Sequence, residues 1–381
     1  MLKVILVFGT RPEAIKMAPL VLGLKKFPSK FDVKVVVTAQ HRKMLDQVLE
    51  IFEITPDIDL NLMQPGQQLS QLTAHILEEM NSVLEKEKPD LVLVHGDTTT
   101  TFATALSCFY NGIKIGHVEA GLRTYQMHSP FPEEFNRQAV SKITDFHFAP
   151  TSTCKENLVK EGVSESSIAV TGNTVVDSIH WTLNLLDTRD DIREPVVSNL
   201  VRVLGFDWTI EQFILVTGHR RENFGDGFQQ ICAALAELGS KFPQMHFVYP
   251  VHLNPNVQVP VQSTLGNLPN IHLIQPLDYL SFTSLLRNCK LVLTDSGGIQ
   301  EEAPSLGKPV VLMRETTERP EALEAGTIRL VGANKERIVT EVTKLLEDEI
   351  SYKQMVKIRN PFGNGDSVEL IIDYLIKTFK L

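Results

Sequence analysis

The chain has 381 residues, 43% of them hydrophobic, so it can bury a large core, and its length favours two domains over one. Its formal net charge is −9, with Lys and Arg scattered among acidic residues, which argues against binding to nucleic acid or another polyanion. Its apolar segments are shorter than the roughly 20 residues of a membrane helix and its four cysteines are far apart, which predicts a cytoplasmic protein without membrane attachment, disulfides or zinc.

The first predicted strand, residues 3–9, opens a series of apolar runs in the first half of the chain. The runs are rich in Val and Ile and lack polar alternation, as expected of parallel strands that are covered on both faces. Amphipathic segments between the runs predict helices. The other strands of this series are predicted at 32–39, 90–97, 114–120, 145–150 and 167–172.

A second series of strands and helices begins near residue 213. Its strands are predicted at 213–218, 245–251, 270–277, 291–296, 309–313 and 327–332. Strands that alternate with helices form open parallel sheets, so the chain is predicted to be an α/β protein with two doubly wound, Rossmann-like domains. Ligands of such sheets bind beyond the carboxyl ends of the strands, and we expect an inter-domain cleft to hold the site.

The junction between the domains is predicted in the charged segment 188–197, which contains a proline and lacks an apolar stripe. The N-terminal domain is then 1–187 and the C-terminal domain 188–365. The last helix, 366–381, could pack on either domain, and one option is that it completes the first.

The loop after the first strand combines a glycine, a proline and two cations. Gly9 permits a tight exit from the strand, and Pro12 suits the first turn of a helix. Arg11 and Lys16 would then lie near the start of that helix, where a phosphate also meets free backbone amides. The alternative is a glycine turn with two solvated cations.

Carboxylates follow the next strands of the N-terminal domain. Asp97 ends one strand, where it would either face a pocket or act as the N-cap of the next helix. Glu119 ends the following strand, where a charged residue is uncommon. Glu133 and Arg137 are four residues apart and would share a helix face. A mere surface ion pair there would contribute less than about 1 kcal/mol.

The C-terminal domain repeats this pattern of polar residues at strand ends. His219 follows its first strand, where it could bind phosphate as a cation or transfer protons, although a single histidine is more often structural. The turn 296–298 precedes a helix and would bind phosphate through backbone amides. Glu302 could accept hydrogen bonds from ribose hydroxyls, and Arg319 follows a later strand. This set predicts a nucleotide diphosphate site.

Other classes of site have little support in the sequence. No GxGxxG dinucleotide motif and no GxxxxGK[ST] P-loop follows a predicted strand. His95, His117 and His147 lie on separate strands without ligand spacing and are interpreted as packing or hydrogen-bonding residues. The DxD pair of Asp57 and Asp59 lies in a short acidic loop near no other carboxylate motif. We therefore predict neither a metal nor a cofactor.

The strand ends and the loops beside them carry motifs that can be recognised together. In chain order they are GTRPEAIK, HGDTTTT, HVEAGLRT, SPFPEEFNR, TGHRREN, YPVHLNPNV and TDSGGIQEEAPSLGKPVVLMRETTERPEA. From the first strand to about residue 332 the chain resembles the bacterial non-hydrolysing UDP-N-acetylglucosamine 2-epimerases. The resemblance implies a GT-B fold, a homodimer, and interconversion of UDP-GlcNAc and UDP-ManNAc to supply ManNAc for surface polysaccharides. It also implies that neither NAD nor an essential metal takes part.

The resemblance further implies a mechanism and a role for each predicted residue. Members eliminate UDP in an anti fashion to give a 2-acetamidoglucal, and UDP then adds to the other face. The residues implied to hold UDP are Arg11, His219, Ser296, Gly297 and Gly298, with Glu302 on the ribose, Phe282 near the uracil and Arg319 near the sugar and phosphates. Those implied to line the sugar side are Lys16, Asp97, Glu119, Glu133 and Arg137.

Epimerisation removes a proton from one face of C2 and returns one to the other, so it needs two acid–base groups or one mobile group. Asp97, Glu119 and Glu133 are the candidates, and sequence alone does not assign their faces. We favour Asp97 as the base toward the GlcNAc isomer. Arg137 and His219 complete the predicted catalytic set.

Some bacterial relatives also bind a second UDP-GlcNAc as an activator beside the active site. Gln40, Glu133 and His252 match positions used there. However, Lys43 replaces a glutamine, and Gly66 falls about where such relatives carry an arginine. Activation is therefore left open.

Three rival functions also stay open. A hydrolysing epimerase would release ManNAc and UDP. A GT-B glycosyltransferase would use the same donor but would need an acceptor groove, for which we find no candidate segment. A non-catalytic sensor of UDP-sugars would have little need of Asp97, Glu119 and Glu133 together.

Overall fold

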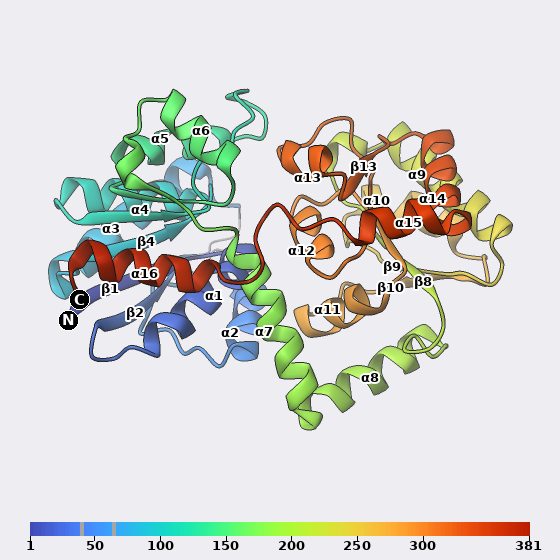
Figure 1. Ribbon diagram of the computed structural model, residues 1–381, viewed down its shortest axis with the longest axis horizontal. Coiled ribbons are helices and arrows are strands. Elements are labelled where there is room, and N and C mark those ends of the chain that lie inside the picture. Colours follow the sequence, from blue (N-terminus) through green and yellow to red (C-terminus); the bar gives the residue numbers. More distant parts are fainter. Residues whose placement is uncertain (39–41, 63–65) are drawn as a thin grey trace. The chain divides into compact units, whose positions relative to one another are not determined.

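The computed structural model describes residues 1–38, 42–62 and 66–381 (Figure 1). The chain forms two compact units. The N-terminal unit comprises Met1–His180 and Phe362–Leu381, and the C-terminal unit comprises Trp181–Pro361. The first division falls inside helix α7 (Thr174–Thr188), a few residues before the predicted boundary, and the last helix belongs to the N-terminal unit.

Within its described residues, the N-terminal unit contains a parallel sheet of seven strands in the order β3-β2-β1-β4-β5-β6-β7. The strands are β1 (Leu2–Phe8), β2 (Phe31–Val37), β3 (Ile58–Asp59), β4 (Leu91–His95), β5 (Lys114–Val118), β6 (Phe146–Ala149) and β7 (Ile168–Val170). The helices are α1 (Arg11–Lys25), α2 (Arg42–Ile51), α3 (Leu69–Glu87), α4 (Thr99–Tyr110), α5 (Glu133–Ile143), α6 (Ser152–Lys160), η1 (Glu165–Ser167), α7 (Thr174–Thr188) and α16 (Ser367–Phe379).

Helices cover both faces of this sheet, as its continuous apolar strands require. On one face, Ile76 and Met80 of α3 and Ala103 of α4 share a core with Val92 and Val94 of β4. On the other face, α1 packs on β1 and β2, and α16 lies beside α1 (Figure 1). The buried sheet therefore leaves its strand ends as the places where polar side chains can gather.

The C-terminal unit, described throughout, contains a parallel sheet of six strands in the order β10-β9-β8-β11-β12-β13. The strands are β8 (Phe213–Thr217), β9 (His246–Pro250), β10 (Ile271–Ile274), β11 (Leu291–Thr294), β12 (Val310–Leu312) and β13 (Ile328–Leu330). The helices are α8 (Asp190–Leu204), η2 (Arg221–Asn223), α9 (Asp226–Lys241), α10 (Pro255–Leu265), α11 (Tyr279–Asn288), α12 (Ile299–Ser305), α13 (Pro320–Ala325), α14 (Lys335–Glu347) and α15 (Glu349–Val356).

Every predicted strand is present, and one segment predicted as a loop contains a strand. Residues 57–59, predicted as a loop, contain the short strand β3, which pairs with Val36 and Val37 at the edge of the sheet. A strand of two residues is too short to leave a pattern in the sequence. The segment 188–197, where the sequence placed the junction, mostly belongs to helix α8, whose buried residues Leu200 and Leu204 lie beyond that segment.

Both sheets reverse their winding direction at one point. In the N-terminal unit the point lies between β1 and β4, and in the C-terminal unit it lies between β8 and β11. The loops that follow such a pair of strands run to opposite sides and leave a crevice, where ligands of doubly wound sheets bind. Gly9 and Asp97 follow the first pair, and His219 and Ser296 follow the second.

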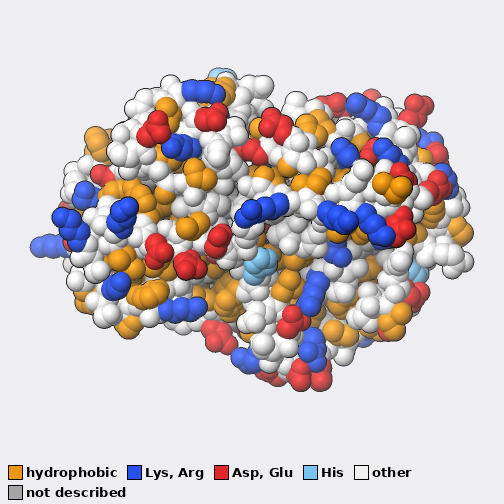
Figure 2. Space-filling model, in the orientation of Figure 1, with side chains coloured by type: hydrophobic (Ala, Val, Ile, Leu, Met, Phe, Trp, Pro, Cys, Tyr) orange, Lys and Arg blue, Asp and Glu red, His pale blue; other side chains and the backbone are white. Residues whose placement is uncertain are grey.

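The surface is mixed in charge, in keeping with the composition. On the face shown in Figure 2, Lys and Arg side chains are interspersed with Asp and Glu side chains on both units. All four cysteines are free and buried. Across the ranges that the structure describes, no helix is both long and apolar enough to cross a bilayer.

The packing of α16 generates a stability prediction. Leu375 of α16 is fully buried, whereas Lys377 of the same helix is exposed. Leu375→Ala should lower the free energy of unfolding by about 2–5 kcal/mol because it leaves a cavity, and Lys377→Ala should change it by less than about 0.5 kcal/mol. Urea denaturation followed by circular dichroism measures both. Equal effects of the two substitutions would contradict the packing of α16 in this unit.

Candidate active site

A buried carboxylate joins the loops that follow β1 and β4. Thr10 caps α1, and Glu13 Oε2 accepts hydrogen bonds from the backbone amides of Gly9, at 3.1 Å, and Thr10, at 2.8 Å. Glu13 Oε1 accepts a hydrogen bond of 2.6 Å from the hydroxyl of Thr98, in the loop after β4. Burial raises the pKa of the Glu13 carboxyl, and these hydrogen bonds oppose the rise. Glu13 thus fixes the start of α1, which carries Arg11, beside the loop after β4, which carries Asp97.

The close approach of these loops explains the glycine at the end of β1. A Cβ on Gly9 would collide with the hydroxyl oxygen of Thr38 and would lie 2.7 Å from that of Thr100. These two hydroxyls are hydrogen bonded to each other at 2.9 Å. No larger residue fits there unless the loops separate.

Lys16 and Glu119, both predicted from the sequence, form a buried ion pair. Lys16 Nζ contacts Glu119 Oε2, and the side-chain amide of Asn173 donates a hydrogen bond of 2.6 Å to the same oxygen. Glu119 has a φ of 65°, in the left-handed region that residues other than glycine seldom adopt. Such backbone strain persists only where the surroundings impose it, and it is concentrated at functional sites.

A third group, His95, lies beside this pair. Its Nε2 is 3.8 Å from Glu119 Oε2, and among the described residues neither ring nitrogen has a hydrogen-bond partner. Burial is the main cause that lowers the pKa of His95 to about 4, so the ring is neutral at pH 7. His117 and His147 do make hydrogen bonds, to the carbonyls of Gly96 and Ser141, as interpreted from the sequence. His95 is therefore the packed but unbonded member of the three.

Arg137 connects two carboxylates at the carboxyl end of β4. Its Nη2 and Nε donate to Asp97 Oδ2 at 2.7 and 3.0 Å, and its Nη1 donates to Glu134 Oε2 at 3.1 Å. Burial tends to lower the pKa of the Arg137 guanidinium, but Asp97 and Glu134 raise it above its ordinary value. The N-cap of α4 is Thr98, so the alternative interpretation of Asp97 as a helix cap was wrong. Asp97 is instead a partly exposed carboxylate held by an arginine.

Glu133 and Arg137 both lie on α5, as expected, but Arg137 forms its ion pair with another residue of that helix. The ion pair within α5 uses the spacing of three residues, so Glu134 takes the place expected for Glu133. Glu134 is fully buried and accepts backbone hydrogen bonds from Thr124 and Tyr125 as well. Glu133 begins the helix, half-buried, and its Oε2 has no hydrogen-bond partner within the part of the chain that the structure describes. Glu133 therefore lies on the same helix as Arg137, but the ion pair of Arg137 within that helix is with Glu134.

In the C-terminal unit, the loops after β8 and β11 meet at Asp295. This carboxylate is fully buried and accepts hydrogen bonds from the backbone amides of His219 and Arg220, at 2.9 Å each. The His219 ring is partly exposed and stacks on that of His252, with the ring centres 5.6 Å apart. Burial lowers the pKa of His219, and Asp295 opposes this effect. His219 thus lies in the loop that follows β8, at the carboxyl end of that strand.

The glycine turn after β11 lies against a pair of arginine and glutamate side chains. A Cβ on Gly297 would lie 2.8 Å from Arg319 Nη1 and 3.2 Å from Glu318 Oε1. Arg319 Nε donates a hydrogen bond of 2.6 Å to Glu301, which is fully buried, and its Nη1 donates one of 2.9 Å to Glu318. Glu301 follows the glycine turn, and its carboxylate compensates the charge of Arg319 and orients this arginine beside the turn.

This network continues outward through a second arginine. Arg314 donates to Glu222 and Glu318, both at 2.7 Å. Burial alone would raise the pKa of Glu318, but Arg319 and Arg314 hold it well below its ordinary range. Five side chains of alternating charge therefore form one chain of ion pairs.

Two other predicted residues lie on helices of the C-terminal unit, and a third lies outside the described residues. Glu302 is nearly buried on α12, next to Glu301. Phe282 is half-buried on α11. Gln40 lies outside the described residues, so of the proposed activator contacts Glu133 and His252 can be placed and Gln40 cannot.

Sequence reasoning missed the residues that support the predicted ones. The missed residues are Glu13, Glu134, Asn173, Asp295 and Glu318. One of them had a readable signal, because Thr10 and Glu13 have the spacing of a capping box. Asn173 and Asp295 act across loops that are distant in sequence, so spacing carries no signal for them. Glu134 and Glu318 lie within four residues of the arginines that they bind, but sequence reasoning did not select them.

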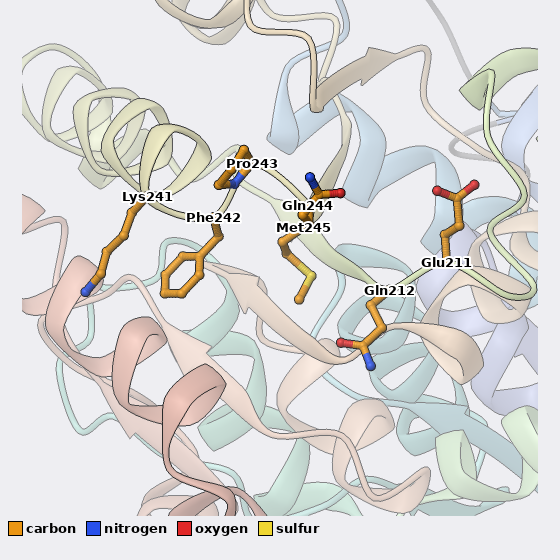
Figure 3. Close-up of a pocket in the computed structure, with 7 residues that line it drawn as sticks. All are labelled: Glu211, Gln212, Lys241, Phe242, Pro243, Gln244 and Met245. Carbon is orange, nitrogen blue, oxygen red and sulfur yellow. The ribbon is translucent and has the colours of Figure 1, made fainter.

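The hollow drawn in Figure 3 lies apart from the candidate active site. It has a volume of about 470 Å³ and is lined by Glu211, Gln212, Lys241, Phe242, Pro243, Gln244 and Met245. These residues precede β8 or connect α9 to β9, at the amino-terminal edge of the sheet. In residues 1–38, 42–62 and 66–381, no three His, Cys, Asp or Glu side chains are grouped to hold a metal ion. The candidate active site therefore remains at the carboxyl ends of the strands.

Comparison with known proteins gives extensive matches. A family model described as UDP-N-acetylglucosamine 2-epimerase matches residues 24–376. The UDP-N-acetylglucosamine 2-epimerase of Escherichia coli (strain K12) is 54% identical over 374 residues, 98% of each chain. That of Campylobacter jejuni is 53% identical over 380 residues, 98% of this chain and 97% of the relative.

Solved structures agree with these matches. The crystal structure of UDP-GlcNAc 2-epimerase from Neisseria meningitidis bound to UDP-GlcNAc has a TM-score of 0.91 and 49% identity, covering 98% of this chain and all of that one. The Methanocaldococcus jannaschii enzyme in complex with UDP-GlcNAc and UDP has a TM-score of 0.83 and 34% identity, covering 98% and 99%. These similarities and the two parallel α/β sheets confirm the predicted GT-B-like fold.

The arginine and glutamate chain generates a prediction about pH. Because the pKa of Glu318 is lowered in the folded state, its ion pairs stabilise the fold above the ordinary value of 4.5, and this stabilisation is lost as the pH falls toward the folded pKa. The free energy of unfolding of the wild type should therefore fall between pH 5 and pH 3 more steeply than that of Glu318→Gln. Glu324→Gln, at an exposed position, should behave as the wild type. Urea titrations at each pH test this, and parallel curves for all three proteins would refute it.

Proposed function

The chain belongs to the UDP-N-acetylglucosamine 2-epimerase family, and we propose that it interconverts UDP-GlcNAc and UDP-ManNAc by inverting the configuration at C2. The observation that carries the proposal is the set of paired charges at the carboxyl ends of β1, β4 and β5. Asp97 and Glu119 lie there as carboxylates, each in contact with a cation. A sugar offers hydroxyls and a leaving phosphate, and such a set can bind both.

The chemistry of the substrate sets the main demand on the site. The proton at C2 has no adjacent carbonyl to acidify it, so departure of UDP must run ahead of proton loss. We propose anti elimination of UDP to a 2-acetamidoglucal, followed by addition of UDP to the opposite face. Most of the catalytic effect then comes from stabilising the negative charge on the leaving diphosphate.

The proposal assigns the nucleotide to the C-terminal unit. The turn of Ser296, Gly297 and Gly298 is proposed to bind the diphosphate, with Arg319 beside it. Support for this assignment comes from the guanidinium next to Gly297, which Glu301 and Glu318 hold in place. Further contacts are proposed for His219 and Arg11 with UDP, for Glu302 with the ribose and for Phe282 near the uracil.

The acid–base groups are assigned to the N-terminal unit. Asp97 remains our proposed base toward the GlcNAc isomer, since its side chain is 26% exposed whereas that of Glu119 is 8% exposed. Glu119 and Glu133 are the candidates for the proton on the other face. Glu119 contacts Lys16 and Asp97 contacts Arg137, so each proposed acid–base carboxylate is held beside a cation.

The proposed context follows the resemblance of the sequence. We propose that the enzyme works as a homodimer without NAD or an essential metal, and that its product supplies ManNAc for a surface polysaccharide. Binding of a second UDP-GlcNAc as an activator is not part of the proposal, because Lys43 and Gly66 differ from the residues of the activated relatives.

Proton NMR of UDP-GlcNAc with the purified protein in heavy water, without added metal or NAD, tests the function. We expect UDP-ManNAc to form and deuterium to enter at C2. Asp97→Asn should lower the rate by about 100-fold or more while UDP binding persists. Free ManNAc and UDP would instead indicate a hydrolysing enzyme. Bound but unchanged UDP-GlcNAc would refute epimerisation and favour a glycosyltransferase or a sensor.

The assignment of Glu302 to the ribose has its own test. Glu302→Gln should weaken UDP binding about 10-fold, the effect of losing charged hydrogen bonds to the ribose hydroxyls. Its affinity for inorganic pyrophosphate, which has no ribose, should not change. Isothermal titration calorimetry with both ligands measures this. An equal loss for UDP and pyrophosphate would show that Glu302 acts through the phosphate turn instead.

A further inference from the structure

Asp295 is a buried carboxylate that predictions from the sequence did not include. It follows β11 and has no exposed surface. Its two oxygens accept hydrogen bonds from the backbone amide of His219 at 3.1 and 2.9 Å, and Oδ2 also accepts from the amide of Arg220 at 2.9 Å. The side-chain amide of Asn223 donates to Oδ2 at 3.2 Å and to the carbonyl of Met313 at 3.1 Å. Asp295 therefore organises the whole loop after β8.

The carboxylate also faces the ring of His219. Asp295 Oδ1 lies 3.6 Å from His219 Nδ1, and among the described residues His219 is the one basic side chain that forms an ionic contact with Asp295. The His219 side chain is 40% exposed, and its ring is stacked on that of His252 at an interplanar angle of 21°. One ring nitrogen thus faces the protein interior, and the other, Nε2, is left for a ligand.

A negative charge at this position needs an explanation. A buried carboxylate without an arginine or lysine partner is costly, and the backbone bonds alone could be made by a neutral asparagine. The charge adds something that an amide does not, because it attracts a proton to the nearest imidazole nitrogen and stabilises the ring once it is cationic.

We propose that Asp295 is the positioning residue of His219, keeping a proton on Nδ1 so that Nε2 is presented to the diphosphate of the substrate. This inference rests on the proposed function, in which His219 contacts UDP. When the diphosphate approaches, its negative charge favours the doubly protonated ring, and Nε2–H then donates a hydrogen bond to an oxygen of the leaving group. As the bond from C1 to that oxygen breaks, the oxygen keeps the electron pair and the hydrogen bond strengthens.

The surroundings of His219 determine how its titration should respond. Burial, Arg220 and His252 all lower the pKa of His219, and Asp295 is the group that raises it. Asp295→Asn removes this opposing charge but keeps an oxygen to accept backbone hydrogen bonds. The pKa of His219 should then fall further below its ordinary value, and the neutral ring should no longer favour a proton on Nδ1.

Nitrogen NMR of the ligand-free protein, labelled at histidine with nitrogen-15, tests this directly. His219→Gln identifies the His219 signals by their loss. In the wild type we expect the neutral ring to carry its proton on Nδ1, and in Asp295→Asn we expect the altered tautomer and the lower pKa. A wild-type ring protonated on Nε2 would overturn the proposal, even if Asp295→Asn does not fold. Because no substrate is present, this outcome is independent of whether the enzyme epimerises UDP-GlcNAc.

Kinetics then separate positioning from simple support of the loop. Introduced into the wild-type enzyme, Asp295→Asn should lower kcat/KM at least about 10-fold, because His219 loses its supporting partner. Introduced into His219→Gln, the same substitution should have little further effect on kcat/KM. Asn223→Ala loosens the same loop without removing the charge, and it should leave the His219 tautomer unchanged. Equal losses from Asp295→Asn in both backgrounds, or the same tautomer change in Asn223→Ala, would overturn the positioning role.

Discussion

Compensation of buried charge is the constraint on which the strand ends of this protein depend. Both sheets bury continuous apolar strands, so charged side chains collect where the strands end and must find partners there. Lys16 with Glu119, and Arg137 with Asp97, meet this requirement in the N-terminal unit. A paired charge is held in one orientation before any ligand arrives, and such preorganisation is what electrostatic catalysis requires.

The two units meet the same constraint in different ways. In the N-terminal unit Lys16 and Arg137 each bind a carboxylate that we propose to be catalytic, and the proposal assigns these pairs to the sugar. In the C-terminal unit the carboxylates Glu301 and Glu318 lie behind Arg319 and orient it beside the glycine turn. This difference fits a division of labour in which one unit handles protons and the other handles negative charge.

The sequence predicted much of this, for identifiable reasons. Continuous Val and Ile runs predicted each long strand, and strand ends indicated where Asp97, Glu119 and His219 lie. The partners could not be predicted in the same way, because Asp295 and His219 are brought together by two loops that are distant in sequence. Arg137 pairs with Glu134, three residues before it, and not with Glu133, four residues before it. Both spacings bring side chains together on a helix, so spacing alone does not identify the partner. Strand β3 was too short to leave any pattern.

The place of α16 has a consequence for synthesis of the chain. The N-terminal unit is interrupted at His180 and resumes only at Phe362, so its last helix is made after the whole C-terminal unit. The sheet of this unit is complete long before, with the apolar side of α1 still uncovered at Gly23, where Val368 and Ile372 later pack. The C-terminal unit is a continuous segment and can fold as soon as it leaves the ribosome. The unit that is made first is therefore the one that is finished last.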